Sequence, residues 1–191
     1  MKEILMKYLA KYTSLTEAEQ QAIIEELIIK GFKKGTYLIK QGDSPTKKCF
    51  FVLKGCVRQY YLDDDGKEAT SNFYTEEQAI LLFNYEEPDQ SSTYSLICQE
   101  DCVLVVADVE SELKMYKQYT GLESMTRSMM ETYLAQAQNE YAVFIRSSPE
   151  ARYKMIVQNR PELLKRVPQH QLASYLGMTP ESLSRIKKRI Q

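Results

Sequence analysis

The stretch PQHQLASYLGMTPESLSRIKKRI, residues 168–190, decides how the C-terminal part of the chain folds. Its first half carries an apolar face at helical spacing, formed by Leu172, Ala173 and Leu176. Gly177 follows, at the place where a helix end favours a positive φ. Thr179 is a preferred N-cap residue and Pro180 suits the first helical position, so a second helix is predicted from there. Two short helices joined by a turn that contains glycine form a helix-turn-helix.

The predicted second helix has an apolar side and a polar, basic side. Its inward residues are Leu183, Ile186 and Ile190. On the outside, Arg185 can donate two parallel hydrogen bonds to a guanine edge, and Glu181 can accept one from a cytosine amino group. We predict these two residues as base contacts, with phosphate contacts from Gln169, Thr179, Ser182, Lys188 and Arg189. The plainer alternative is a helical hairpin with a solvated basic face.

The charge of the chain divides at Ser147. The sequence has 191 residues and a formal net charge of only -1, which taken alone argues against a nucleic-acid-binding protein. From Ser147 onward, nine basic residues stand against three acidic ones, a net charge of +6, and the rest of the chain carries -7. This asymmetry is typical of an acidic body with a basic end that faces nucleic acid. A basic helical tail that serves solubility is the alternative.

Between Gly31 and Val109 the pattern changes to short runs rich in β-branched and aromatic residues. The predicted strands are 36–39, 49–53, 56–62, 69–74, 93–98 and 102–107, and 76–83 is predicted as a short helix. The segment 63–67, with Asp-Gly between two strands, predicts a hairpin. Such closely spaced strands predict an antiparallel double-stranded β-helix, or jelly roll, and with the helices an α+β fold.

Helical spacing is present on both sides of the strands. Residues 3–30 are predicted as two helices, the second beginning with a capping box at Thr16 and Glu19. The stretch 121–146 is predicted as one long helix with an apolar stripe formed by Leu122, Met125, Met129, Tyr133, Ala137, Tyr141 and Phe144. We interpret it as a dimerisation helix, and packing against the chain's own strands is the alternative.

The cysteines and the single histidine limit the chemistry of the chain. No C-x-x-C pair is present among Cys49, Cys56, Cys98 and Cys102, so no metal site is predicted. A redox role for Cys98 and Cys102 is left open. His170 lies outside the strand region and no nucleophile elbow or P-loop is present, so no catalytic residue and no enzyme activity are predicted. No apolar run suits a signal peptide or a membrane span, and we expect a cytoplasmic protein without membrane contact.

On the residues QLASYLGMTPESLSRI at 171–186, the chain resembles the Crp/Fnr family of bacterial transcription regulators over essentially its whole length. Segments 34–43 and 51–55 add to the resemblance. It places the family's base-contacting Glu and Arg on Glu181 and Arg185, whereas Pro180 stands where members often have a further Arg.

The resemblance implies three parts of the chain. These are a cyclic nucleotide-binding-like β-roll with N-terminal helices at 1–115, a dimerisation helix at 116–146 and a helix-turn-helix DNA-binding domain at 147–191. The family also implies a homodimer through 121–146 that binds a pseudo-palindromic site in double-stranded DNA, and contact with RNA polymerase.

Members of the family that bind cyclic nucleotides hold the ribose with a Gly-Glu pair and the phosphate with an Arg that precedes Ser or Ala. Aligning Ser92 with that Ser places Ser91 at the Arg position and Leu81 at the Glu position. Without the Arg, a buried phosphate would lack its paired cation, so cyclic AMP and cyclic GMP are not expected to bind. An iron–sulfur cluster is not expected either, because the first cysteine is Cys49. No cofactor is predicted, and the sequence leaves two alternatives for the roll: another small-molecule effector, or none.

Together these features predict a homodimeric, sequence-specific DNA-binding transcription regulator whose sensor roll does not bind cyclic AMP. The alternative function is a small-molecule sensor whose helical tail docks a protein partner. Salt dependence distinguishes the two, because DNA binding weakens steeply with salt as counterions are released.

Overall fold

The computed structural model describes residues 2–44, 48–81 and 91–190 of the chain. Within them the helices are α1 (Lys2–Tyr12), α2 (Glu17–Glu26), α3 (Val109–Gln118), α4 (Thr120–Arg146), α5 (Pro149–Asn159), α6 (Leu163–Arg166), α7 (Gln169–Tyr175) and α8 (Pro180–Ile190). The strands are β1 (Ile28–Phe32), β2 (Tyr37–Ile39), β3 (Lys48–Lys54), β4 (Val57–Leu62), β5 (Glu68–Tyr74), β6 (Ala79–Ile80), β7 (Ser95–Cys98) and β8 (Cys102–Asp108).

The strands form two antiparallel sheets that share one core. The first has the strand order β1-β8-β3-β6 and the second has the order β2-β7-β4-β5. Val52 and Leu104 from the first sheet and Leu96 from the second are fully buried in the same cluster. This arrangement confirms the predicted jelly roll and the α+β class. The predicted hairpin at 63–67 is also confirmed, since the Asp63 N–H donates to the Lys67 carbonyl at 3.0 Å between β4 and β5.

The second N-terminal helix, α2, begins at the predicted capping box but ends earlier than predicted. The capping box is confirmed: the Thr16 N–H donates to Glu19 Oε2 at 2.8 Å, and the Glu19 N–H donates to Thr16 Oγ1 at 3.3 Å. Helix was predicted up to residue 30, whereas β1 begins at Ile28 and pairs with β8. The β-branched Ile28 and Ile29 satisfy their backbone in the sheet instead.

The segment 76–83 was predicted as a short helix, and this prediction is wrong for its described part. Ala79 and Ile80 form strand β6, which pairs with β3. Ile80 is 1% exposed, because the pairing with Phe50 places it in the core of the roll. The last two residues of the predicted helix lie outside the described residues.

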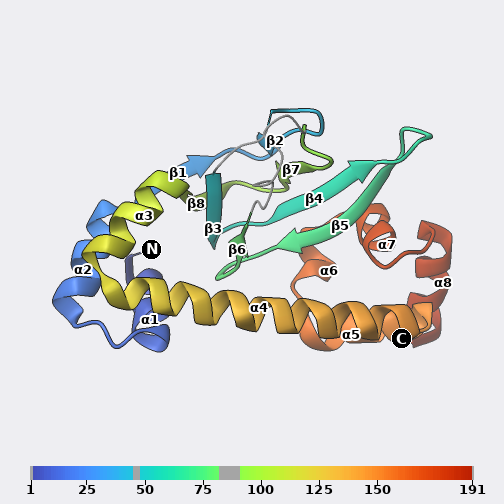
Figure 1. The fold of residues 1–191 in the computed structure, drawn as a ribbon. Coiled ribbons are helices and arrows are strands. Elements are labelled where there is room, and N and C mark those ends of the chain that lie inside the picture. The colour runs from blue at the N-terminus through green and yellow to red at the C-terminus, as the bar shows by residue number, and fades with distance from the viewer. Residues whose placement is uncertain (1, 45–47, 82–90, 191) are drawn as a thin grey trace.

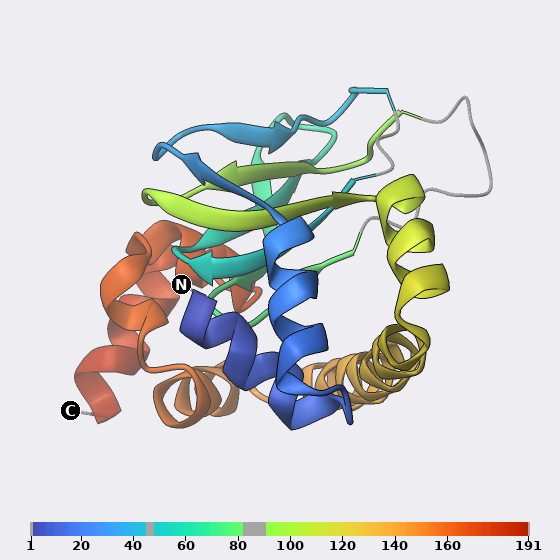
Figure 2. The same ribbon diagram turned by 90° about the vertical axis from the view of Figure 1, so that its left-hand side faces the viewer.

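Helix α4 runs beneath the roll from α1–α3 at one end to α5–α8 at the other (Figure 1). Figure 2, which looks along α4, shows α1 and α2 beside each other below the sheets. No helix among the described residues combines the length and the apolar character needed to cross a membrane.

The apolar stripe predicted along α4 does not form a single surface. Leu122 and Met125 are buried in a cluster with residues of α1 and α2, and the Tyr133 hydroxyl donates to the Glu77 carbonyl at 3.4 Å. These parts of the stripe therefore pack within the chain, whereas the prediction of a dimerisation helix stays untested. Further along α4, Tyr141 of the stripe is exposed at 68%, together with Leu134 at 62% and Ile145 at 61%, which lie outside the stripe.

Candidate nucleic-acid interface

Helices α7 and α8 form the predicted helix-turn-helix. Gly177 has a φ of 66°, and the Met178 N–H donates to the Ala173 carbonyl at 3.0 Å, which ends α7 in a Schellman-type turn. Met178 packs against the core, and Ala173 is 0% exposed. Leu183 and Ile186 are buried as predicted, whereas Ile190, predicted to face inward, is exposed at the end of α8.

Thr179 caps α8 as its sequence predicts. Its Oγ1 accepts the Ser182 N–H at 3.2 Å, and the hydroxyls of the two residues are also 3.2 Å apart. Hydrogen bonds from the backbone N–H of Glu181 and from the Thr179 hydroxyl lower the pKa of the Glu181 carboxyl, so this side chain is charged at neutral pH. The first turn of α8 thus presents one carboxylate and two hydroxyls.

The predicted base contacts lie on the outer side of α8. Glu181, Arg185 and Lys188 are exposed, and Ser182 is half-buried. Within the described part of the chain, Arg185 and Lys188 form no salt bridge, so their charged groups are available to a partner. The structure therefore brings Thr179, Glu181, Ser182, Arg185 and Lys188 to one side of a single helix.

Two of the predicted phosphate contacts, Gln169 and Arg189, are not free on the outer side of α8 with the others. Gln169 is exposed as the first residue of α7, apart from the outer side of α8. Arg189 donates through Nη2 to Glu150 Oε2 at 2.6 Å, and Lys154 Nζ lies 2.9 Å from the other oxygen of Glu150. A phosphate bound by Arg189 would compete with this carboxylate of α5.

The C-terminal region, from Ser147 onward, contains basic residues that the structure divides into two groups. Five of them contact the chain itself: Arg152, Lys154, Arg160, Arg166 and Arg189. Lys165, Arg185, Lys187 and Lys188 form no salt bridge with any described residue. The net charge of +6 therefore overstates the charge directed at a partner.

The C-terminal region docks on the roll instead of standing apart from it. Cys56 and Phe73 of the roll are 0% exposed in one cluster with Tyr153, Leu163, Leu172 and other residues of α5–α8. The rings of Phe73 and Tyr175 meet edge to face, with centroids 5.4 Å apart. Ser174 Oγ accepts the Thr70 N–H at 2.9 Å and thereby satisfies one backbone donor on the open edge of β5. A continuous core thus connects the second sheet with α7.

Arg152 connects the helix-turn-helix with the end of α4. Its guanidinium stacks 3.8 Å from the centre of the Phe144 ring and donates to the Phe144 carbonyl at 3.2 Å. It also donates to the Leu176 carbonyl at 3.1 Å, at the end of α7. Sequence reasoning missed the structural roles of Arg152, Arg160 and Arg166. Arg160 and Arg166 contact residues 87 and 90 positions away, a separation that leaves no local pattern.

The three residues predicted for the effector pocket lie beside a gap in the described chain. Leu81 is half-buried after β6, Ser91 is exposed and Ser92 is buried. The Ser92 hydroxyl donates to the Tyr94 carbonyl at 2.7 Å, so it is already bound to the main chain. Residues 82–90, which connect Leu81 to Ser91, lie outside the described residues. The pocket assignment stays a prediction.

The four cysteines are free thiols. Burial raises the pKa of Cys56 to about 12. The Cys98 thiol donates to Cys102, which raises the pKa of Cys98 and lowers that of Cys102. The redox role left open for this pair stays untested. Across residues 2–44, 48–81 and 91–190, no group of three or more His, Cys, Asp or Glu side chains is arranged to hold a metal ion.

Residues 29–119 match the family model of the cyclic nucleotide-binding domain. Among solved structures, FixK2 from Bradyrhizobium japonicum is similar, with a TM-score of 0.68 and 18% identity over 86% of this chain and 84% of that chain. The c-di-GMP responsive global regulator CLP of Xanthomonas campestris has a TM-score of 0.67 and 14% identity, covering 92% of both chains. The catabolite activator protein of Thermus thermophilus has a TM-score of 0.56 and 18% identity, over 93% of this chain and 84% of that chain. A comparison with curated protein sequences found no match.

Proposed function

We propose that the chain is a sequence-specific DNA-binding transcription regulator, because residues 29–119 match the model of the cyclic nucleotide-binding domain and the overall fold is similar to those of FixK2 and CLP. The observation that carries the proposal is the outer side of α8. There Arg185 and Lys188 are exposed without a salt bridge to any described residue, on a helix that a glycine turn holds against α7. Such a helix fits the major groove of DNA, with its N-terminal residues at the base edges.

The residues of this surface have distinct roles in the proposal. Arg185 donates two hydrogen bonds to a guanine edge, and Glu181 accepts one from a cytosine amino group. Phosphate contacts, which position the protein without reading sequence, come from Gln169, Thr179, Ser182, Lys188 and Arg189. Arg189 has to exchange Glu150 for a phosphate, so its contribution is expected to be smaller than that of Lys188.

A homodimer through 121–146 completes the proposed regulator. The exposed residues Leu134, Tyr141 and Ile145 recur after seven and four positions and so share one side of α4. Large exposed apolar residues in a row favour contact with another protein surface, and a second copy offers the same stripe about a twofold axis. Two recognition helices about 34 Å apart would then read a pseudo-palindromic site.

The remaining parts follow from the same proposal. The sensor domain comprises 1–115, the dimerisation helix 116–146 and the DNA-binding domain 147–191, and contact with RNA polymerase follows from the proposed role. The regulator acts in the cytoplasm without catalysing a reaction. Its roll is not expected to bind cyclic AMP or cyclic GMP, because Leu81 and Ser91 stand where a cyclic nucleotide needs Glu and Arg.

Selection of bound sequences from random double-stranded DNA by the full-length protein tests the proposal. We expect a pseudo-palindromic consensus whose binding weakens steeply with salt. The absence of any enriched sequence would contradict the proposal and favour a tail that docks a protein partner. Repeating the selection with a small-molecule cell extract tests the effector.

Arg185→Ala tests the base contact. Loss of a bidentate contact to guanine should cost about 1–3 kcal/mol on the selected site and relax the preference at one base pair in each half-site. Titrations of wild type and variant on the site and on a single-base variant measure both effects. Lys188→Ala is the matched control, because loss of a phosphate contact weakens binding to all sequences alike and lowers the salt slope by about 1. An equal loss on all sequences for Arg185→Ala would make Arg185 a phosphate contact instead.

A further inference from the structure

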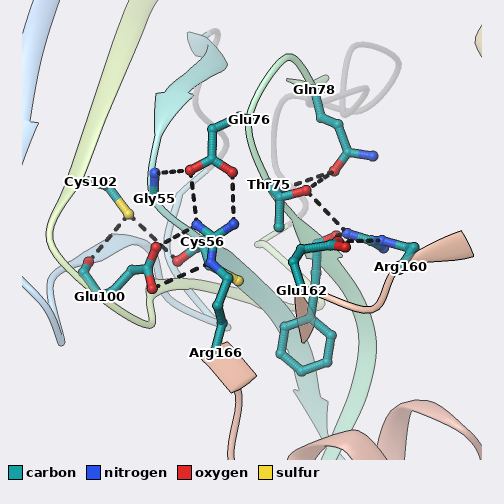
Figure 3. A network of polar contacts seen from close by, with 11 residues as sticks. Gly55, Cys56, Thr75, Glu76, Gln78, Glu100, Cys102, Arg160, Glu162 and Arg166 are labelled. Atoms are coloured by element: carbon teal, nitrogen blue, oxygen red, sulfur yellow. Dashed lines mark hydrogen bonds and ion pairs between the residues drawn. The ribbon is translucent and has the colours of Figure 1, made fainter. Parts of the chain in front are cut away.

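Arg166, at the end of α6, joins the C-terminal region to the roll through two carboxylates (Figure 3). Its Nη1 and Nη2 donate to the two oxygens of Glu76 at 2.7 and 2.9 Å, a bidentate pair. The same guanidinium also donates to Glu100. We call these contacts the Arg166 bridge. Bidentate, charge-assisted pairs of this kind fix geometry as well as contributing energy.

The Arg166 bridge collects three turns at one end of the roll. Glu76 follows β5, and its Oε1 also accepts the N–H of Gly55, in the turn between β3 and β4, at 2.8 Å. Glu100 lies in the turn between β7 and β8, where the Cys102 thiol donates to its carbonyl at 3.3 Å. A shift of any of these turns therefore changes the surroundings of one guanidinium in the C-terminal region.

The bridge is shielded, and other contacts support it. The Arg166 side chain is only 19% exposed, so water and salt screen its ion pairs less than those of a surface pair. Two further contacts connect the C-terminal region to β5. Arg160 donates to the Phe73 carbonyl at 2.8 Å, and Ser174 Oγ accepts the Thr70 N–H. The C-terminal region is thus held at several points and has one defined orientation on the roll.

That orientation leaves both proposed partner surfaces free at once. The outer side of α8 is exposed while Arg166 is bound, and so is the side of α4 that carries Leu134 and Tyr141. In Figure 1, α8 lies near the C-terminal end of α4, next to α7, which contacts β5. The docked orientation is therefore compatible with a dimer whose two α8 helices face DNA.

We propose that Arg166 is a positioning residue for DNA binding, which through Glu76 and Glu100 holds the helix-turn-helix in the orientation that binds the operator. The inference rests on the proposed function. A dimer binds its two half-sites only when both recognition helices have the correct spacing and direction. A loosely held region would have to lose orientational freedom on binding, which weakens affinity without removing a DNA contact.

The variants Glu76→Gln and Glu100→Gln, made separately and together in the full chain, test this inference by the sign of their effect. Each removes a negative charge, so simple electrostatics predicts tighter binding to the selected operator. A positioning role predicts the opposite, an affinity about tenfold lower for the double variant. Asp64→Asn is the control, because it removes the same charge from an exposed position in the β4–β5 hairpin. Unchanged or tighter binding by the double variant would overturn the inference.

Amide hydrogen exchange of β5 measures docking without DNA. The Thr70 N–H is bound to Ser174 only while the C-terminal region is docked, so its exchange should accelerate in Glu76→Gln/Glu100→Gln and in Arg166→Gln. Unchanged exchange in both variants would also overturn the inference. If wild type selects no DNA sequence, the proposed function fails, and this failure is separate from the exchange result.

A double-mutant cycle separates positioning from a general loss of structure. If Arg166 acts through Glu76 and Glu100, Arg166→Gln should weaken operator binding no further when Glu76→Gln/Glu100→Gln is already present. Arg166→Lys keeps the charge but not the two-armed geometry, and should restore part of the affinity lost in Arg166→Gln. Fully additive losses, or no recovery with Lys, would show that Arg166 does not act through this bridge.

Discussion

Gly55 is the residue on which the turns at the end of the roll depend most directly. Its φ of 108° lies in the region that favours glycine, and its N–H holds Glu76 in place for Arg166. A Cβ built on Gly55 would lie 2.5 Å from Cys102 Sγ and 2.8 Å from Cys102 Cα. The second of these atoms belongs to the backbone, so the contact cannot be relieved by turning a side chain.

Gly55→Ala should therefore be strongly destabilising. Steric overlap and backbone strain together should lower the free energy of unfolding by about 3 kcal/mol. Urea unfolding of the full chain measures the effect. Gly31→Ala is the matched control, since a Cβ at Gly31 meets nothing within 4 Å, and its effect should stay within about 0.5 kcal/mol. A loss below about 1 kcal/mol for Gly55→Ala would mean that the turn adapts more easily than its contacts suggest.

Helix α4 shows how one element serves two surfaces. Its N-terminal half buries Leu122 and Met125 against α1 and α2, while Leu134, Tyr141 and Ile145 remain exposed on another side. A 27-residue helix is long enough to leave the first surface as it continues. This explains why periodicity alone did not distinguish packing within the chain from contact with a partner.

Leu134→Asp should convert the proposed dimer into a monomer. A carboxylate in the exposed stripe would have to be desolvated when two copies of the stripe meet in a symmetric contact. We expect the dimer dissociation constant to rise at least about tenfold, measured by light scattering after size-exclusion chromatography over a range of concentrations. Asn139→Asp adds the same charge at an exposed position away from the stripe and should leave the dimer intact. Equal effects of the two variants would argue against this stripe as the interface.

At the scale of the whole molecule, two carboxylates of the roll, Glu76 and Glu100, bind Arg166 of the C-terminal region. Burial of Glu76 disfavours its charged form, but hydrogen bonds from Arg166 and from the Gly55 N–H outweigh burial and lower the pKa of this carboxyl below 4.5. The folded protein thus holds Glu76 in its charged state more strongly than the unfolded chain does. Its contribution to stability is present above pH 4.5 and is lost as the pH falls through the lower folded value.

The pH dependence of stability should therefore differ between wild type and Glu76→Gln. Between about pH 6 and about pH 3, wild type should lose more free energy of unfolding, so the difference between the two proteins narrows with acid. Urea unfolding at several pH values measures this difference. Other carboxyls with lowered pKa, such as Glu19 and Asp108, titrate in both proteins and cancel in the comparison. A difference that does not change with pH would show that Glu76 is not the group responsible.

Features set by neighbouring residues could be predicted from the sequence. The capping box at Thr16, the hairpin at 63–67 and the turn at Gly177 each depend on residues within a few positions of one another. Features that depend on residues far apart in the sequence could not be predicted. Ile28 continues a helical pattern in the sequence, but in the structure it pairs with Val106 of β8. The sequence around Arg166 gives no sign that this residue binds Glu76, 90 positions away. The jelly roll was predictable because its strands and turns repeat, whereas the docking of α7 on β5 has no such signal.

The core shared by the roll and the C-terminal region limits how the protein can be taken apart. Tyr175 packs on Phe73, and Leu163 and Leu172 lie in the same cluster as Cys56. A chimera that fused residues 147–191 to an unrelated sensor would expose these apolar side chains and leave the Ser174 hydroxyl without its partner on β5. The proposed operator preference of this chain therefore cannot be transferred with residues 147–191 alone. A graft has to carry β4, β5 and the two carboxylates that bind Arg166 along with the helices proposed to bind DNA.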